Sequence, residues 1–203
     1  MINENLLAPE QRTEQWYQDR SGRFTGSRFK DLLKKDKDNK PLKAYHDLII
    51  QIVGERLTGR YQESGMDSYA LRHGREVEPY ARQAYELETG AMVVQAAFIQ
   101  HPIYKFVGAS PDGLIGVDGG IEIKCPKDWD IHIERFENGM EDEHMPQVQG
   151  CTWVTGRKWW DFVSYDPRVN EHLRFYRQRV WRDDKYIAEL DRAVMLAEHE
   201  VRT

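Results

Sequence analysis

The sequence predicts an α/β fold in a single domain of 203 residues, with a central mixed β-sheet flanked by helices. Apolar residues recur at helical spacing in the first part of the chain and again near its end. Between these parts, short segments rich in valine and aromatic residues alternate as strands do. We therefore expect one domain spanning residues 1–203, with a helical part at about residues 1–90, a sheet-bearing catalytic core at about residues 91–181 and a C-terminal helix at about residues 183–202.

Four segments predict helices because their apolar side chains lie three and four positions apart. These segments are residues 27–35, 42–57, 71–87 and 183–201. Gly59 and Gly90 follow the second and third segments, as expected where a left-handed residue ends a helix. Further helices are expected at residues 128–137 and 144–154, and polar loops at residues 34–41 and 61–67.

Extended segments alternate with turn residues from residue 91 onward. They cover residues 91–99, 104–109, 112–117, 121–125, 159–165 and 173–181. The pair Gly119-Gly120 predicts a tight hairpin turn between the third and fourth of these strands. Pairing through that turn would bring Asp112 alongside Glu122. Side chains alternate across a strand, so Glu122 and Lys124 are expected to share one face.

Composition excludes some classes of protein. No apolar stretch is long enough to span a membrane, and the N-terminus lacks the pattern of a signal peptide. Cys125 and Cys151 form no CxxC pair, so we expect neither a disulfide framework nor a zinc site, and a reducing cytoplasm fits best. The net charge of -5 is unusual for a protein that binds phosphates, although nine basic residues face three acidic ones between Arg20 and Lys43.

Asp112, Glu122 and Lys124 are the residues that point to a reaction. Carboxylate oxygens favour Mg²⁺, for which Mn²⁺ can substitute, and such ions stabilise the attacking and leaving oxygens of a phosphodiester. The backbone carbonyl of Ile123 is a candidate for a further metal ligand. Lys124 could orient the attacking water or accept its proton. The spacing alone occurs by chance, but a charged pair inside an apolar strand is costly unless it is paired or binds a cation.

Six sequence strings occur in the order in which one known family has them. They are WYQDRSGRFTGS, HGREVEPYAR, SPDGL, EIKCP, MPQVQGCTWVTG and SYDPR. The chain resembles the PD-(D/E)xK nuclease superfamily, with its restriction-endonuclease-like core, and within it the bacteriophage lambda exonuclease, or YqaJ-like alkaline exonuclease, family. The resemblance implies a 5′-to-3′ exonuclease that processively digests one strand of linear duplex DNA to mononucleotides with two divalent ions.

The resemblance also implies partners. They are duplex DNA ends, preferably 5′-phosphorylated, two further copies of the chain in a ring-shaped homotrimer, and a protein that anneals the exposed 3′ strand during phage recombination. A phage or prophage protein in the cytoplasm of a bacterial host is implied. Two alternatives remain open: a structure- or site-specific endonuclease of the same superfamily, and a DNA-binding protein without catalytic activity.

Individual residues take roles from the same resemblance. Asp112 and Glu122 match the metal-binding carboxylates, Lys124 the catalytic lysine and Glu78 a glutamate near the metals. Two glutamines, Gln147 and Gln149, fall in a Q-x-Q helix segment, and Gln149 is expected to be the better contact to water or phosphate. Arg20 matches the receptor for the 5′-phosphate, with Ser27 and Ser110 supplying hydroxyls. Leu71 is expected to be either a wedge between the terminal bases or a core residue.

Overall fold

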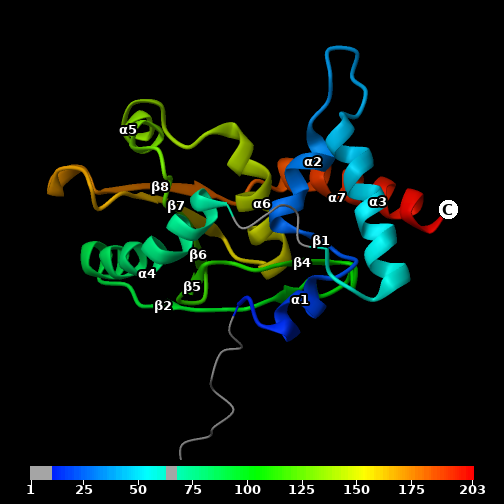
Figure 1. Ribbon diagram of the computed structural model, residues 1–203, viewed down its shortest axis with the longest axis horizontal. Helices are drawn as coiled ribbons and strands as arrows, with labels where there is room; N and C mark the ends of the chain where they lie inside the picture. The colour runs from blue at the N-terminus through cyan, green and yellow to red at the C-terminus, as the bar shows by residue number, and fades with distance from the viewer. Residues whose placement is uncertain (1–10, 63–67) are drawn as a thin grey trace, which may run out of the picture.

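The computed structural model describes residues 11–62 and 68–203 and has the mixed α/β architecture that the sequence predicts (Figure 1). The predicted loop at residues 61–67 lies outside this description from residue 63 onward, as do residues 1–10 of the expected helical part. In the described parts, no helix has the length and apolarity needed to cross a membrane. The helices are α1 (Glu14–Arg20), α2 (Phe29–Leu33), α3 (Lys43–Thr58), α4 (Tyr69–Thr89), α5 (Trp129–Asn138), α6 (Met145–Thr155) and α7 (Asp184–Arg202), with 3₁₀ turns η2 (Gly26–Arg28), η3 (Asp142–His144) and η4 (Glu171–Leu173).

Two sheets hold the molecule together. The strands are β1 (Phe24–Thr25), β2 (Val93–Val94), β3 (Ile99–Gln100), β4 (Val107–Ala109), β5 (Gly113–Ile115), β6 (Gly119–Lys124), β7 (Trp159–Tyr165) and β8 (Phe175–Trp181). The larger sheet has the order β2-β5-β6-β7-β8, and the smaller one β1-β4-β3. Strands β6 and β7 are parallel, whereas the other pairs of the larger sheet are antiparallel. The mixed sheet is thereby confirmed.

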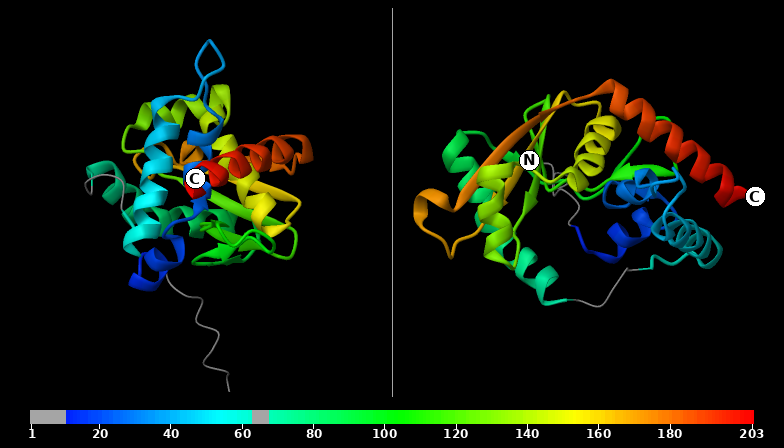
Figure 2. Two further views of the ribbon diagram at one scale, coloured as in Figure 1. Left: turned by 90° about the vertical axis from the view of Figure 1, so that its right-hand side faces the viewer. Right: turned by 90° about the horizontal axis from the view of Figure 1, so that it is seen from above.

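Helices cover both faces of the larger sheet. Figure 1 shows α4 and α5 on opposite sides of β7 and β8, with α6 near the middle of the molecule. Helix α4 packs on the face formed by Ile121 and Val163, and its Tyr85 belongs to the same apolar cluster. On the other face, Phe162 of β7 and Val148 of α6 belong to an apolar cluster that also contains residues of α2, α3 and α7. Figure 2 shows α7 running alongside these helices to the C-terminus.

The prediction of a hairpin turn at Gly119-Gly120 is wrong, because both glycines are inside β6 and pair with Ile115 and Leu114. The turn lies at residues 116–118, where Gly116 has a φ of 51°. The glycines serve a different purpose. A methyl group on Gly120 would come within 2.2 Å of the ring of Trp160, which is fully buried. The bare backbone therefore lets β7 place its tryptophans against β6.

Other predicted elements differ in length. The helices predicted at residues 42–57, 71–87 and 183–201 are confirmed as α3, α4 and α7. The helix predicted at residues 27–35 is shorter, since η2 precedes it and α2 ends at Leu33. The strands predicted at residues 91–99 and 104–109 are reduced to two or three residues each in β2, β3 and β4.

Replacing Gly120 by alanine should lower the free energy of unfolding by about 1–3 kcal/mol, because the new methyl group displaces the Trp160 ring from a packed core. Gly54→Ala is the matched control: no atom lies within 4 Å of its added methyl group in α3. That change should raise stability by roughly 0.5–1 kcal/mol through helix propensity. Urea unfolding of both variants measures the difference, and equal stabilities would contradict this account of the β6–β7 contact.

Candidate active site

The structure brings Asp112, Glu122 and Lys124 together. The pairing of Gly113 with Ile121 places Asp112 next to Glu122 across the β5–β6 ladder. Asp112 Oδ2 accepts a hydrogen bond from the Ile123 amide at 2.6 Å. Lys124 Nζ donates to Glu122 Oε1 at 2.7 Å, and the Glu122 residue is 2% exposed. Strand alternation thus presents a carboxylate pair and an ammonium on one face of the sheet.

The electrostatics of this cluster show a shortage of positive charge. Burial raises the pKa of Asp112 well above its ordinary value, and the carboxylates of Glu122 and Glu78 raise it further. Burial alone would lower the pKa of Lys124, but Glu122 and Asp112 outweigh it and the pKa is raised. Glu122 Oε2 is buried without a hydrogen-bond partner. One ammonium therefore does not satisfy the two carboxylates.

A divalent cation fits this donor set. The cluster lines a hollow of about 350 Å³ together with Ile123. Oxygen donors of this kind suit Mg²⁺ or Mn²⁺ better than a soft metal. Within residues 11–62 and 68–203, no three His, Cys, Asp or Glu side chains gather at metal-ligand spacing. The side-chain donors are thus two carboxylates, and the orphaned Glu122 Oε2 is the atom that most needs a cation.

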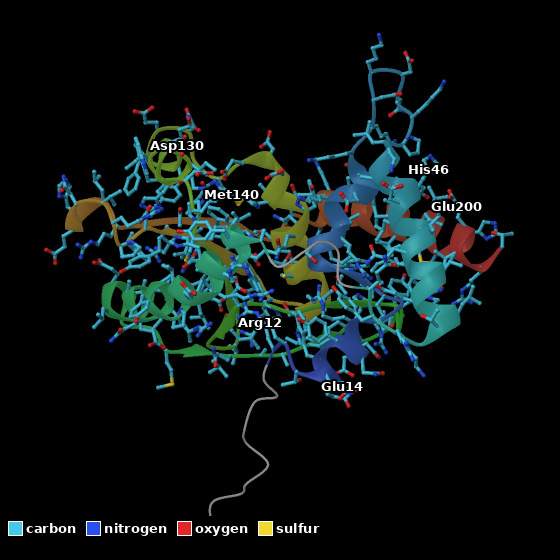
Figure 3. The ribbon with its side chains drawn as sticks, in the orientation of Figure 1. Arg12, Glu14, His46, Asp130, Met140 and Glu200 are labelled. Carbon is cyan, nitrogen blue, oxygen red and sulfur yellow. The ribbon has the colours of Figure 1, made fainter. Side chains whose placement is uncertain are left out.

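Glu78 of α4 lies at the rim of the same hollow. Its carboxylate accepts hydrogen bonds from Arg82 at 2.6 Å and from Arg12 at 3.1 Å. Figure 3 shows Arg12 between α1 and the sheet-bearing part of the molecule. Arg12 had no sequence signal, because it meets α4 only through the fold. These two guanidinium groups hold Glu78 where its charge reaches Asp112.

The two glutamines of α6 have different surroundings, and the structure brings Gln147 rather than Gln149 to the hollow. Gln147 lines the hollow, and its Oε1 lies 3.4 Å from Lys124 Nζ. Gln149 is 2% exposed; it donates to the carbonyl of Trp181 at 2.8 Å and accepts from the amide of Asp183 at 2.9 Å. Residues two apart point to nearly opposite sides of a helix. Gln149 therefore joins α6 to the end of β8.

Leu71 and His144 complete the surroundings. Leu71, in the first turn of α4, is 48% exposed and lines the hollow, so the alternative that it is a core residue is wrong. The ring of His144 stacks on Phe162 with centroids 5.1 Å apart. Burial and the charge of Lys124 lower the pKa of His144 to about 4, so it is neutral at pH 7.

A second polar cluster surrounds Arg20, which is 7% exposed at the end of α1. Its guanidinium donates to Ser110 Oγ at 3.0 Å, to Ser27 Oγ at 3.2 Å and to Thr25 Oγ1 at 3.5 Å. The Trp16 ring covers it at 4.4 Å, and its Nε is buried without a partner. Among the described residues no carboxylate forms an ion pair with Arg20. Sequence reasoning missed Thr25, although it lies within the string WYQDRSGRFTGS that also contains Arg20 and Ser27.

The two clusters are neighbours. Ser110 of the Arg20 cluster lies two residues before Asp112 in the connection between β4 and β5. On the other side, a methyl group on Gly26 would lie 3.5 Å from Gln147 Cγ, so η2 with Ser27 packs close to α6. Within residues 11–62 and 68–203, a buried cation without a carboxylate partner thus lies beside the pair of Asp112 and the buried Glu122.

Comparisons with known proteins identify relatives of this fold. The alkaline exonuclease LHK-Exo from Laribacter hongkongensis is 38% identical, with a TM-score of 0.85 over 94% of this chain and 93% of that one. The same protein has been solved in complex with dAMP. A phage related exonuclease from Haemophilus somnus 129PT shares the fold at 16% identity, with a TM-score of 0.70 over 88% of this chain and 93% of that one.

The ExoD protein of Escherichia coli (strain K12) is 36% identical over 55 residues, which is 27% of this chain. That match spans 62% of ExoD, less than two thirds of its length. The YqaJ-like viral recombinase domain matches residues 15–158, which include Arg20, Glu78 and the cluster on β5 and β6. The predicted resemblance and the predicted fold are confirmed. The chain belongs to the family of YqaJ-like viral recombinase domains.

Proposed function

We propose that the protein is a magnesium-dependent exonuclease that processively digests one strand of linear duplex DNA from its 5′ end. It releases mononucleotides and leaves a 3′ single-stranded tail. The observation that carries this proposal is the pair of Asp112 and the buried Glu122, whose Oε2 has no hydrogen-bond partner among the described residues, beside Lys124. Membership of the family and the likeness to an alkaline exonuclease support the reaction class.

Asp112, Glu122 and the Ile123 carbonyl would hold Mg²⁺, with Mn²⁺ as a substitute. When bound, two such ions polarise the scissile phosphate and favour ionisation of the attacking water. The protein's own side chains orient the phosphate and the attacking water. Lys124 donates hydrogen bonds toward the phosphate or the water, and the neighbouring Gln147 offers an amide. Glu78, fixed by its two arginines, adds negative charge at the edge of the site.

The Arg20 cluster would bind the terminal 5′-phosphate. A buried guanidinium without a counter-ion is costly, and a phosphate supplies the missing charge together with acceptors for its donors. Hydroxyls of Ser27, Ser110 and Thr25 hold the guanidinium in position. Two residues of extended chain span about 7 Å, so the phosphate would sit within one nucleotide of Asp112. The complex of LHK-Exo with dAMP supports the binding of mononucleotides in this family.

Family membership supports further parts of the proposal. The protein would act as a ring-shaped homotrimer around duplex DNA, with a single-strand annealing protein as partner. It would work in the cytoplasm of a bacterial host, encoded by a phage or prophage. Leu71, half-exposed beside the hollow, would separate the terminal base pair.

Lys124→Ala should reduce nucleotide release at least about 100-fold, because the ammonium that offsets Glu122 and orients the reactants is lost. DNA binding should change little, since the proposed pocket of Arg20 for the terminal phosphate is left intact. Release from a 5′-phosphorylated linear duplex in Mg²⁺ measures the effect, and EDTA should stop the wild-type reaction. A covalently closed circle should stay intact. Near-normal turnover of the variant would remove Lys124 from the mechanism, and cleavage of the circle would favour an endonuclease.

Arg20→Ala should abolish the preference for 5′-phosphorylated over 5′-hydroxyl ends. Loss of charge-assisted hydrogen bonds of about 1.5–3 kcal/mol predicts that the ratio of the two kcat/KM values falls by roughly tenfold to 100-fold. Arg23→Ala is the control, because Arg23 donates to the carbonyl of Lys105 and faces the Phe98 ring. An unchanged ratio in the Arg20 variant would retire the assignment of the phosphate pocket.

A further inference from the structure

Glu55 is a buried carboxylate of α3 that bonds to groups in four segments of the chain. The residue is 1% exposed. Its Oε1 accepts from Arg28 at 2.5 Å, from the Gln62 amide at 3.1 Å and from the Gln51 side chain at 3.1 Å. Its Oε2 accepts from the Gly22 amide at 2.7 Å and from Arg28 at 3.0 Å. Five donors thus converge on one side chain.

Three of these segments carry parts of the Arg20 cluster. Gly22 follows Arg20 by two residues, at the turn where α1 ends and the chain reverses. Arg28 is the neighbour of Ser27 in η2. Gln62 is the neighbour of Tyr61, whose ring centroid lies 5.7 Å from the Arg20 guanidinium. Glu55 itself does not contact Arg20, but it fixes the backbone on three sides of it.

Glu55 also separates the roles of two buried cations. Arg20 and Arg28 are each 7% exposed, and the Tyr61 ring lies near both. Glu55 neutralises Arg28 through a two-pronged ion pair. Arg20 is left with hydroxyl partners and an unpartnered Nε. Of these two guanidinium groups, only that of Arg20 therefore has no carboxylate partner among the described residues and would be neutralised by an external anion.

A contribution to stability alone does not account for this arrangement. Burying an ion pair costs desolvation that its attraction often fails to recover, and apolar replacements are frequently as stable. The Glu55 carboxylate also accepts hydrogen bonds from two backbone amides of loops, those of Gly22 and Gln62. These bonds determine the position of the loop backbone. Such a group defines one conformation of the surrounding loops.

We propose that Glu55 is a positioning residue of the 5′-phosphate pocket, which holds the loops at Gly22 and Gln62 and the turn at Arg28 so that Arg20 and its hydroxyls converge on a terminal phosphate. This inference rests on the proposed function of Arg20. Glu55 touches no substrate; it determines which ends the enzyme recognises and how tightly.

The test is Glu55→Gln, which keeps the size of the side chain but gives it one acceptor oxygen instead of two. The KM for 5′-phosphorylated duplex should rise about tenfold while kcat stays within about twofold, so the preference over 5′-hydroxyl ends shrinks. In magnesium-free buffer, inorganic phosphate should raise the Tm of the wild type and not that of the variant. A folded variant that keeps both the preference and the phosphate response overturns the inference.

Asp161→Asn is the matched control. Asp161 is fully buried, bonds to Arg179 and Tyr85, and lies on the sheet face opposite to Glu122. It should lose stability yet keep the end preference and the phosphate response. If it loses them as Glu55→Gln does, the effect is general loosening and the inference fails.

A double variant keeps the inference testable if Glu55→Gln alone fails to fold. Glu55→Gln with Arg28→Gln removes both charges of the buried pair, so neither member of that pair is left as an uncompensated charge. It should still lose the phosphate response, whereas full recovery would show that Glu55 only neutralises Arg28 and would overturn the inference. Failure of the proposed function is distinguishable, because the wild type would then show neither end preference nor stabilisation by phosphate.

Discussion

The carboxylates of Asp112 and Glu122, with the ammonium of Lys124 beside them, form the constraint on which the rest of the structure depends. Burial and the charge of Glu122 raise the cost of ionising Asp112, and Lys124 offsets only part of it. Folding without a cation is therefore unfavourable at this point of the sheet. The two carboxylates repel each other in the protein alone, and a divalent ion bound between them would relieve that repulsion.

The fold keeps this unfavourable arrangement rigid. Gly119 and Gly120 allow the tryptophans of β7 to lie directly on β6, which fixes the strand that carries Glu122 and Lys124. The Arg20 cluster shows the opposite deficit, a buried cation that has no carboxylate partner among the described residues. In the proposed complex, DNA with bound magnesium would supply both missing charges at once. Complementary deficits in neighbouring pockets thus explain how one ligand could satisfy two sites that the protein alone leaves incomplete.

Local patterns predicted much of this structure. Apolar periodicity gave α3, α4 and α7, and strand alternation placed Glu122 and Lys124 on one face. Sequence patterns were less informative where contacts between distant parts of the chain determine the structure. The glycine pair predicts a turn from the sequence, but in the structure it leaves room for the rings of Trp159 and Trp160. Spacing alone also does not reveal which side of α6 faces the site, where Gln147 lies beside Lys124 and Gln149 binds the end of β8. Arg12 and Glu55 lie outside the six sequence strings and reach their partners only through tertiary structure. Thr25 lies inside one of the strings, but only the fold shows that its hydroxyl meets Arg20.

Titration of Mn²⁺ into the DNA-free protein, followed by electron paramagnetic resonance, tests the central claim most directly. The wild type should bind Mn²⁺ at the carboxylate pair, and Glu122→Gln should weaken that binding at least about tenfold, since it replaces the oxygen that lacks a partner. Equal affinity in the two proteins, or no binding by the wild type, would contradict the account of this site as a metal-dependent nuclease centre.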